Sequence, residues 1–205
     1  NKGNWIENRD LKIINLTYDE LQTYSIESLK PDSKYSNRFK KQQSVKGAKI
    51  SRLIDLFKLA TEEENKDVFL NLEIKSTPIE EGLTPDPQTL VSLILKDIKE
   101  YNLENRVVIT SYDWRILYEL KKQNSNVLRG FITLQQGLSK TKKNIYEDSP
   151  WMGKKFSPDE LFLLPDTIKK LEGHVWSVFY KDVTKQNVEI AHKHGLAVTV
   201  WTVNR

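Results

Sequence analysis

The fold of this chain is indicated most clearly by the stretch Val68-Phe69-Leu70-Asn71-Leu72-Glu73-Ile74-Lys75. The stretch is short, mostly apolar and without strict polar alternation, a pattern typical of strands buried in a parallel sheet. Side chains alternate between the two faces of a strand, so Asn71, Glu73 and Lys75 share one face. We expect the apolar side chains between them to face helices, on the other side of the sheet.

Outward from this stretch, four more apolar stretches of strand length alternate with amphipathic helical patterns. The predicted strands cover residues 68–75, 107–111, 129–134, 175–180 and 196–203, and the predicted helices lie within residues 53–60, 87–101, 113–122, 159–172 and 184–194. Alternating strands and helices predict a parallel α/β fold, either a doubly wound sheet or a (β/α)₈ barrel. The eight glycines form no G-x-G-x-x-G motif, which weakens the dinucleotide-binding alternative. We therefore predict an incomplete (β/α)₈ TIM barrel with about five of eight strand–helix units, since a complete barrel takes about 250 residues.

Two regions of the chain differ in composition. Residues 1–50 are polar and irregular, with a helix-capping box predicted at Thr17 and Glu20, and we interpret them as a loop-rich insertion segment of the barrel. Residues 51–205 carry the strand and helix patterns, and we interpret them as the middle and later strands of the TIM barrel.

Composition excludes several classes of protein. Of 205 residues, 38% are hydrophobic and 29% are charged, and no apolar run approaches a transmembrane span. The absence of cysteine excludes disulfides, thiol catalysis and zinc–thiolate sites, and it fits the cytoplasm or the periplasm. No signal peptide is visible and the chain does not begin with Met, so periplasmic, extracellular and cytoplasmic locations stay open.

A nucleic-acid partner is not expected from the charge pattern. The net charge of +4 is spread thinly along the chain, whereas nucleic-acid binding requires a dense basic face. The stretch Arg38-Phe39-Lys40-Lys41 comes nearest to a phosphate-binding patch. A short charge run of this kind is more typical of a solvated turn.

Glu73 and Lys75 are the main candidates for chemistry, because they stand at the carboxyl end of a predicted barrel strand, where barrel enzymes place their sites. Two interpretations stay open: an ion pair at the rim, or Glu73 as ligand of a hard cation with Lys75 steadying an anionic group. Trp201, in the last predicted strand, is either core filler or a substrate platform. One hydroxyl of the Thr110-Ser111 pair is expected to face the mouth, and Ser111 is the candidate for substrate binding.

The other polar residues near the predicted strands have structural interpretations. Asp113 is predicted to cap the helix that follows it. His192 and His194 lie near a predicted helix C-terminus and His174 precedes a strand, so we expect all three at the end opposite the mouth. The sequence predicts no Ser–His–Asp arrangement and no histidine metal-ligand spacing.

Taken together, these motifs resemble the glycerophosphodiester phosphodiesterase family over nearly the whole chain. The resemblance is carried by Leu16–Leu21, Ile50–Phe57, Asn71–Lys75, Val108–Trp114, Ser149–Trp151 and His194–Asn204. It implies a (β/α)₈ barrel that hydrolyses glycerophosphodiesters to glycerol 3-phosphate and an alcohol, with a divalent cation, Ca²⁺ or Mg²⁺. It further implies that Glu73 binds the metal, that Lys75 lies near the phosphate and stabilises its charge, and that Trp201 lines the substrate pocket.

The chain also departs from the family pattern. The family's His-Arg-Gly, Glu-x-Asp and His-Asp motifs, which would supply the acid–base histidines and two metal carboxylates, do not occur here, nor does its last Gly-Val-Asp-Gly-type strand. We therefore expect a barrel incomplete at both ends, and a piece that is inactive alone.

Rival functions stay open at this point. They are a barrel phosphodiesterase acting on lysophospholipids or phosphoinositides, a non-catalytic phosphodiester-binding barrel, and an unrelated parallel α/β enzyme. The expected partner is a small-molecule glycerophosphodiester. Head-group preference, metal identity and oligomeric state are left open.

Overall fold

The computed structural model describes residues 5–6, 11–124, 126–136 and 143–204. The chain divides into two compact units, Asn1–Leu59 and Ala60–Arg205. This division lies beyond the change of composition at residue 50 and coincides with the end of helix α3 (Leu53–Ala60). Among the described residues, no helix has the length and apolar character required to cross a bilayer.

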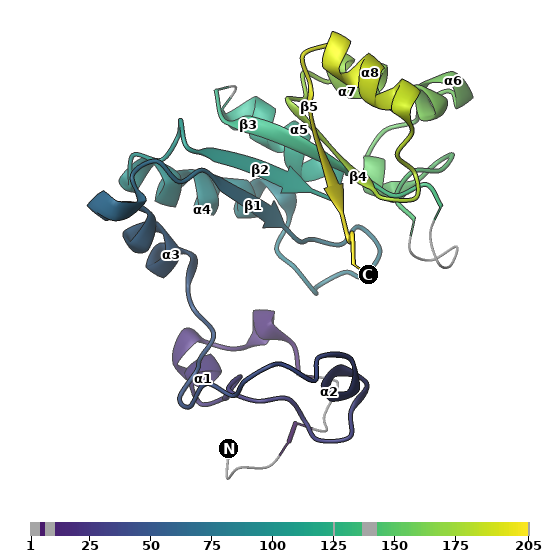
Figure 1. The fold of residues 1–205 in the computed structure, drawn as a ribbon. Helices are drawn as coiled ribbons and strands as arrows, with labels where there is room; N and C mark the ends of the chain where they lie inside the picture. The colour runs from purple at the N-terminus through teal and green to yellow at the C-terminus, as the bar shows by residue number, and fades with distance from the viewer. Residues whose placement is uncertain (1–4, 7–10, 125, 137–142, 205) are drawn as a thin grey trace. The chain divides into compact units, whose positions relative to one another are not determined.

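The second unit contains a sheet of five parallel strands in sequential order (Figure 1). The strands are β1 (Leu70–Ile74), β2 (Val107–Ser111), β3 (Leu128–Thr133), β4 (Val175–Phe179) and β5 (Ala197–Trp201). Each strand pairs with the next one along the chain, which is the connectivity of a barrel rather than of a doubly wound sheet. The predicted parallel α/β fold, an incomplete barrel, is therefore confirmed.

Helices connect the strands and cover one face of the sheet (Figure 1). They are α4 (Pro87–Glu100), α5 (Trp114–Gln123), α6 (Pro158–Phe162), α7 (Leu164–Lys170) and α8 (Lys185–Lys193), with short 3₁₀ helices η2 (Glu63–Asn65) and η4 (Pro150–Met152). Helix α5 packs on β2 and β3, and α8 packs on β5. The residues buried between the helices and the sheet include Val91, Ile98, Val107, Ile109, Ile116, Leu117, Leu120, Ile168 and Val178.

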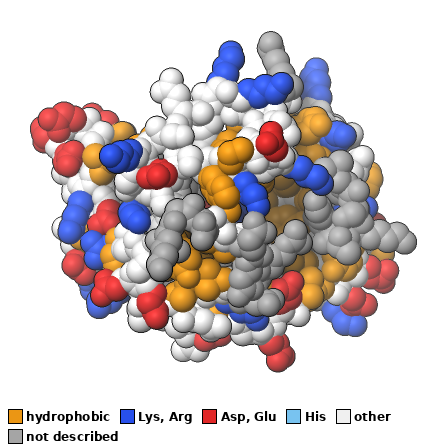
Figure 2. Space-filling model, turned by 90° about the horizontal axis from the view of Figure 1, so that it is seen from below, with side chains coloured by type: hydrophobic (Ala, Val, Ile, Leu, Met, Phe, Trp, Pro, Cys, Tyr) orange, Lys and Arg blue, Asp and Glu red, His pale blue; other side chains and the backbone are white. Residues whose placement is uncertain are grey.

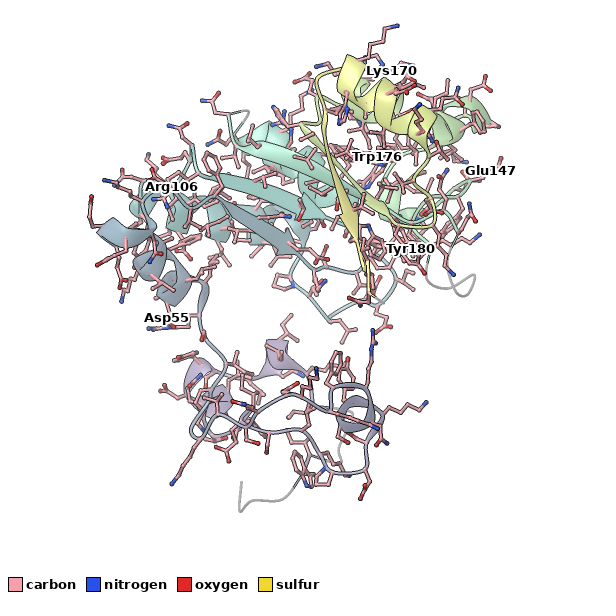
Figure 3. The ribbon with its side chains drawn as sticks, viewed as in Figure 1. Asp55, Arg106, Glu147, Lys170, Trp176 and Tyr180 are labelled. Atoms are coloured by element: carbon pink, nitrogen blue, oxygen red, sulfur yellow. The ribbon has the colours of Figure 1, made fainter. Side chains whose placement is uncertain are left out.

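Two buried tryptophans in this core form hydrogen bonds to residues of β3. The Trp114 ring lies edge-on to Phe131 at 5.0 Å, and its Nε1 donates to the carbonyl of Ile132 at 3.1 Å. Trp176 lies in the second unit (labelled in Figure 3), and its Nε1 donates to the Thr133 hydroxyl at 2.9 Å. Both indole N–H groups therefore have a partner, which removes the cost of burying them.

Helix ends follow from local sequence. The Thr184 side chain accepts from the backbone N–H of Asn187 and caps α8, and Gly195 follows the helix with a φ of +71°, as the sequence predicts. The single helix predicted over residues 159–172 is wrong, because the structure contains α6 and α7 there. Pro165 lies in the first turn of α7, where a missing N–H costs nothing, and it cannot sit inside a continuous helix.

The first unit is built from short elements and turns. These are η1 (Ile13–Asn15), α1 (Tyr18–Gln22), α2 (Lys34–Arg38) and most of α3. The capping box of Thr17 and Glu20 forms as predicted. The described residues of this unit include no strand, in keeping with a loop-rich segment. Its interpretation as an insertion of the barrel stays a prediction.

Candidate functional site

A cavity of about 670 Å³ lies at the carboxyl ends of the strands, on the face that the helices leave uncovered. It is lined by Asn71, Glu73, Lys75, Ser76, Thr110, Tyr112, Ile132, Trp151, Ser177, Trp201 and Thr202. Every second residue along β1 contributes, which places the predicted polar face of this strand in the cavity. The structure thus brings Glu73, Lys75 and Trp201 together in one cavity.

Glu73 and Lys75 form an ion pair at the cavity wall. The Nζ of Lys75 lies 2.5 Å from Oε1 of Glu73, with the side chains 79% and 40% exposed, respectively. An ion pair this accessible to water contributes little to stability. A ligand can therefore replace either partner of this ion pair at a small cost in free energy, as a charged binding site requires.

Next to this pair, a hydrogen bond joins the inner faces of β1 and β2. The Thr110 hydroxyl donates to Oδ1 of Asn71 at 2.9 Å. Gly130 on β3 makes room for it, since a Cβ at that position would stand 2.5 Å from Cγ2 of Thr110. The missing side chain at Gly130 therefore keeps Thr110 and Asn71 in place along the cavity floor.

Behind the cavity, Asp113 anchors the loop that follows β1. Its carboxylate is fully buried and accepts from the Ser76 hydroxyl at 2.7 Å and from the Arg115 guanidinium at 2.9 and 2.6 Å. The same carboxylate raises the pKa of Arg115 and accepts from the Arg115 backbone N–H at 3.2 Å, which confirms it as the cap of α5. Asp113 thereby also holds Ser76, a residue of the cavity lining, a contact that the capping pattern did not predict.

The aromatic side chains of Trp201, Trp151 and Tyr112 form the apolar walls of the cavity. Trp201 packs against Phe179 at 4.8 Å, and its Nε1 donates to the carbonyl of Ser177 at 3.2 Å. Trp151 meets Tyr112 edge-on at 5.1 Å, and burial raises the pKa of the Tyr112 hydroxyl. Tyr112 is therefore a neutral donor near neutral pH. The place of Trp201 in the wall fits the substrate-platform interpretation.

The prediction of Ser111 as a substrate-binding residue is not supported by its position. Its side chain is fully buried, donates to the carbonyl of Ile74 at 2.8 Å and accepts from the N–H of Asp113 at 3.1 Å. It lies on the face opposite the cavity, and Thr110 is the hydroxyl that reaches the lining. The alternation of the strand therefore directs Thr110 to the cavity and Ser111 to the helices.

The histidines lie away from the cavity, as predicted. Nδ1 of His174 accepts from the backbone N–H of Arg129 at 3.1 Å, ahead of β4, and burial lowers its pKa. Nε2 of His194 lies 2.6 Å from Asp166, at the end of α8. None of the chain's three histidines lines the cavity, and the described residues contain no group of three or more His, Cys, Asp or Glu that could hold a metal.

Sequence comparisons relate this chain to one family of known proteins. The model of the glycerophosphoryl diester phosphodiesterase family matches residues 4–205. A glycerophosphodiester phosphodiesterase of Caldanaerobacter subterraneus subsp. tengcongensis is 30% identical over 159 residues, which are 78% of this chain and 52% of that protein. The chain thus spans about half the length of this curated relative.

Solved structures agree with the sequence comparisons. A protein of Silicibacter pomeroyi DSS-3, described as a glycerophosphoryl diester phosphodiesterase, superimposes with a TM-score of 0.79 at 26% identity, covering 100% of this chain and 63% of that one. An Oleispira antarctica phosphodiesterase, solved with its product sn-glycerol-3-phosphate, gives a TM-score of 0.52 at 15% identity, covering 77% of this chain and 51% of that one. The second likeness supports the fold alone.

Proposed function

This chain belongs to the glycerophosphoryl diester phosphodiesterase family, and from that premise we propose that the protein carrying it hydrolyses glycerophosphodiesters to glycerol 3-phosphate and an alcohol. The observation that supports this most directly is the cavity at the carboxyl ends of the strands, lined by Glu73, Lys75 and Trp201 together. In parallel α/β barrels this end of the strands is where active sites lie.

The lining suits a phosphodiester with a glycerol arm. The phosphate carries a negative charge, which the ammonium of Lys75 would neutralise, with the Tyr112 hydroxyl as a further donor in the lining. The carbon side of the glycerol would pack on the ring of Trp201, whose polar edge is already bound to Ser177. Charge neutralisation of this kind lowers the barrier because negative charge builds up on the phosphoryl oxygens in the transition state.

A divalent cation is the second part of the proposal. Glu73 offers a carboxylate in the cavity, and Asn71 on the same face offers an amide oxygen that has one hydrogen bond, from Thr110. Hard cations such as Mg²⁺ and Ca²⁺ bind oxygen ligands, and Mg²⁺ is often held by one or two carboxylates plus substrate phosphate and water. The donor set therefore fits one side of such a site, in which the cation would supply further charge neutralisation at the phosphate.

Proton transfer is the step for which the described lining offers no histidine. Hydrolysis of a phosphodiester needs a group that takes a proton from the nucleophile and a group that protonates the leaving oxygen. The family resemblance assigns these roles to histidines in motifs that this chain does not contain. We therefore expect the 205-residue chain to bind glycerol 3-phosphate without cleaving glycerophosphodiesters.

The test measures release of glycerol 3-phosphate from glycerophosphocholine and glycerophosphoglycerol by the protein with its complete barrel, with lysophospholipids and phosphoinositides as comparison substrates. Activity should disappear with EDTA and return with Mg²⁺ or Ca²⁺. Glu73→Gln should lower kcat/KM about 100-fold, since a neutral amide holds a hard cation more weakly than a carboxylate does. Glu100→Gln on exposed α4 is the matched control and should leave activity unchanged. No release from any glycerophosphodiester would refute the proposed reaction, and full activity of Glu73→Gln would refute the metal assignment alone.

A further inference from the structure

We propose that residues 30–49 of the first unit form a docking surface for a lipid bilayer that contains anionic phospholipids. This surface, called here the basic loop, is independent of the cavity and of the reaction proposed for it. It contains the stretch Arg38-Phe39-Lys40-Lys41, which the charge pattern alone indicated to be a solvated turn.

The basic loop is closed at its base by hydrogen bonds within the first unit. The backbone N–H of Ile26 donates to the carbonyl of Ala48 at 3.1 Å, and the N–H of Val45 donates to the carbonyl of Glu27 at 3.0 Å. Within the loop, Ser33 caps the short helix α2. A turn closed by a bond from the N–H of Gln42 to the carbonyl of Phe39, 3.0 Å long, follows the helix. These hydrogen bonds give the loop a defined backbone conformation, although it has no strand pairing of its own.

The charge of the basic loop is strongly one-sided. It holds seven basic residues, Lys30, Lys34, Arg38, Lys40, Lys41, Lys46 and Lys49, and one acidic residue, Asp32. All seven basic residues are exposed. The whole chain has a net charge of only +4. Such a concentration of cations complements the negative surface potential of an anionic leaflet, where each basic residue adds appreciably to binding.

Large apolar side chains stand among these cations in the basic loop. Tyr35, Phe39 and Val45 are 66%, 42% and 63% exposed, and Ile26 at the base of the loop is 54% exposed. The ring of Tyr35, in α2, lies 5.8 Å from the ring of Phe39, the residue that directly follows this helix. The Arg38 guanidinium lies 5.1 Å from the centre of the Phe39 ring. On the face that it draws, Figure 2 shows hydrophobic side chains exposed beside lysine and arginine side chains.

This combination favours a bilayer over a nucleic acid. Aromatic rings among cations suit either partner, since rings stack on bases and also sit at the lipid headgroup level. Exposed aliphatic side chains such as Val45 and Ile26 find no partner on a nucleic acid, whereas they gain by entering the boundary between headgroups and acyl chains. Basic charge plus inserted apolar groups are the two signals that together give stable, reversible membrane attachment.

Vesicle co-sedimentation of the 205-residue chain tests this proposal. The chain should bind vesicles of phosphatidylcholine mixed with phosphatidylglycerol, and it should not bind phosphatidylcholine alone. Binding should weaken in about 1 M salt, where the Debye length falls to about 3 Å. Lys40→Glu with Lys41→Glu should lower the partition coefficient at least about 30-fold. Each lysine lost should lower it about fivefold, because a basic residue at the bilayer surface contributes about 1 kcal/mol.

The apolar part of the surface needs its own variants. Tyr35→Ser with Phe39→Ser should lower binding at least about tenfold, because each ring contributes by its buried apolar area. Two matched controls in the second unit should bind as the unchanged chain does: Phe162→Ser, where the ring is 77% exposed, and Lys96→Glu with Lys99→Glu on exposed positions of α4. Unchanged circular dichroism would show that all variants remain folded.

Several outcomes would overturn the proposal. Equal binding to neutral and anionic vesicles, or equal losses in the basic-loop and control variants, would show that the loop does not select anionic bilayers. Binding that a short oligonucleotide abolishes at equal ionic strength would assign the loop to a nucleic acid. A change from dimer to monomer in Tyr35→Ser with Phe39→Ser, measured by sedimentation, would assign the loop to contact between copies of this chain.

Discussion

Replacing Asp113 with alanine should destabilise the second unit far more than the loss of an ordinary helix cap. Its carboxylate is fully buried and is the acceptor for three different groups: the Ser76 hydroxyl, the guanidinium of Arg115 and the backbone N–H of Arg115 in the first turn of α5. Alanine removes all of these contacts at once. It also leaves the Arg115 side chain, which is 33% exposed, without the carboxylate that balances its charge.

The magnitude of this loss is the sum of two parts. Removal of the cap costs about 1 kcal/mol in proteins. Breaking a buried ion pair by deleting one partner costs about 3–5 kcal/mol, and the partial exposure of Arg115 places this pair at the lower end of that range. We expect the free energy of unfolding to fall by about 4 kcal/mol in Asp113→Ala. Asp113→Asn, which keeps a capping oxygen without the charge, should lie between this value and the unchanged chain.

Urea unfolding followed by tryptophan fluorescence is the appropriate measurement, because Trp114 and Trp176 are fully buried in the second unit and report on its core. Thr184→Ala is the matched control, since Thr184 caps α8 through one exposed hydrogen bond of 3.2 Å. It should cost about 1 kcal/mol. If Asp113→Ala costs no more than Thr184→Ala, the carboxylate does not organise the loop behind the cavity and the reasoning is wrong.

Two further predictions concern the sheet. Burial, together with the charges of Arg129 and Lys169, lowers the pKa of His174 below 6.5. Below pH 6.5 His174 therefore binds a proton more readily in the unfolded chain than in the folded one. The free energy of unfolding should be highest above pH 6.5 and should fall as the pH drops toward the folded-state pKa of His174. In urea unfolding at about pH 7 and pH 5, His174→Asn should show a smaller difference than the unchanged chain, and an equal difference would contradict this assignment. Gly130→Ala should cost about 1–3 kcal/mol, because the new methyl overlaps Thr110, whereas Gly82→Ala, in open space at a φ of +72°, should cost about 1 kcal/mol from backbone strain. An unchanged urea midpoint in Gly130→Ala would show that Thr110 moves freely.

Local pattern was sufficient to predict most of the fold. The strand predicted at residues 107–111 has these bounds in the structure, and the caps at Thr17, Asp113 and Thr184 form as predicted. These features depend on neighbours within a few residues, which a single sequence contains. The break between α6 and α7 was missed because the apolar spacing continues across it, although Pro165 was the available signal.

The site was harder to predict because it depends on register. Along β1 one face is polar and the other apolar, so the faces of Glu73 and Lys75 could be assigned from sequence. Both Thr110 and Ser111 are buried in β2, so alternation alone did not decide which hydroxyl faces the cavity. The parallel pairing of Glu73 with Thr110 decides it, since paired residues point to the same side of a sheet. That pairing joins two strands that are separated in the chain by a whole helix, so the sequence of neither strand predicts it.

The cavity residues that lie outside the strands could not be predicted from the periodicity of apolar residues. Trp151 belongs to the short helix η4, and Tyr112 and Ser76 follow the ends of strands. Their positions are set by tertiary contacts, such as the bond from the Tyr118 hydroxyl to the carbonyl of Met152 at 2.8 Å, which ties η4 to α5. The resemblance to a family marked Trp151 as part of a motif, but it gave no role for it.

The cavity owes its composition to the order of the strands. Glu73 lies on β1 and Trp201 on β5, which are the two edge strands of the described sheet, yet both line one cavity. Parallel strands place all their carboxyl ends at the same edge, and the twist of the sheet turns the outer strands toward each other (Figure 1). The middle strands therefore set the distance between the charged wall and the aromatic wall. This makes Gly130, on the central strand and without a side chain of its own, the position where a single methyl group should change ligand binding without touching either wall.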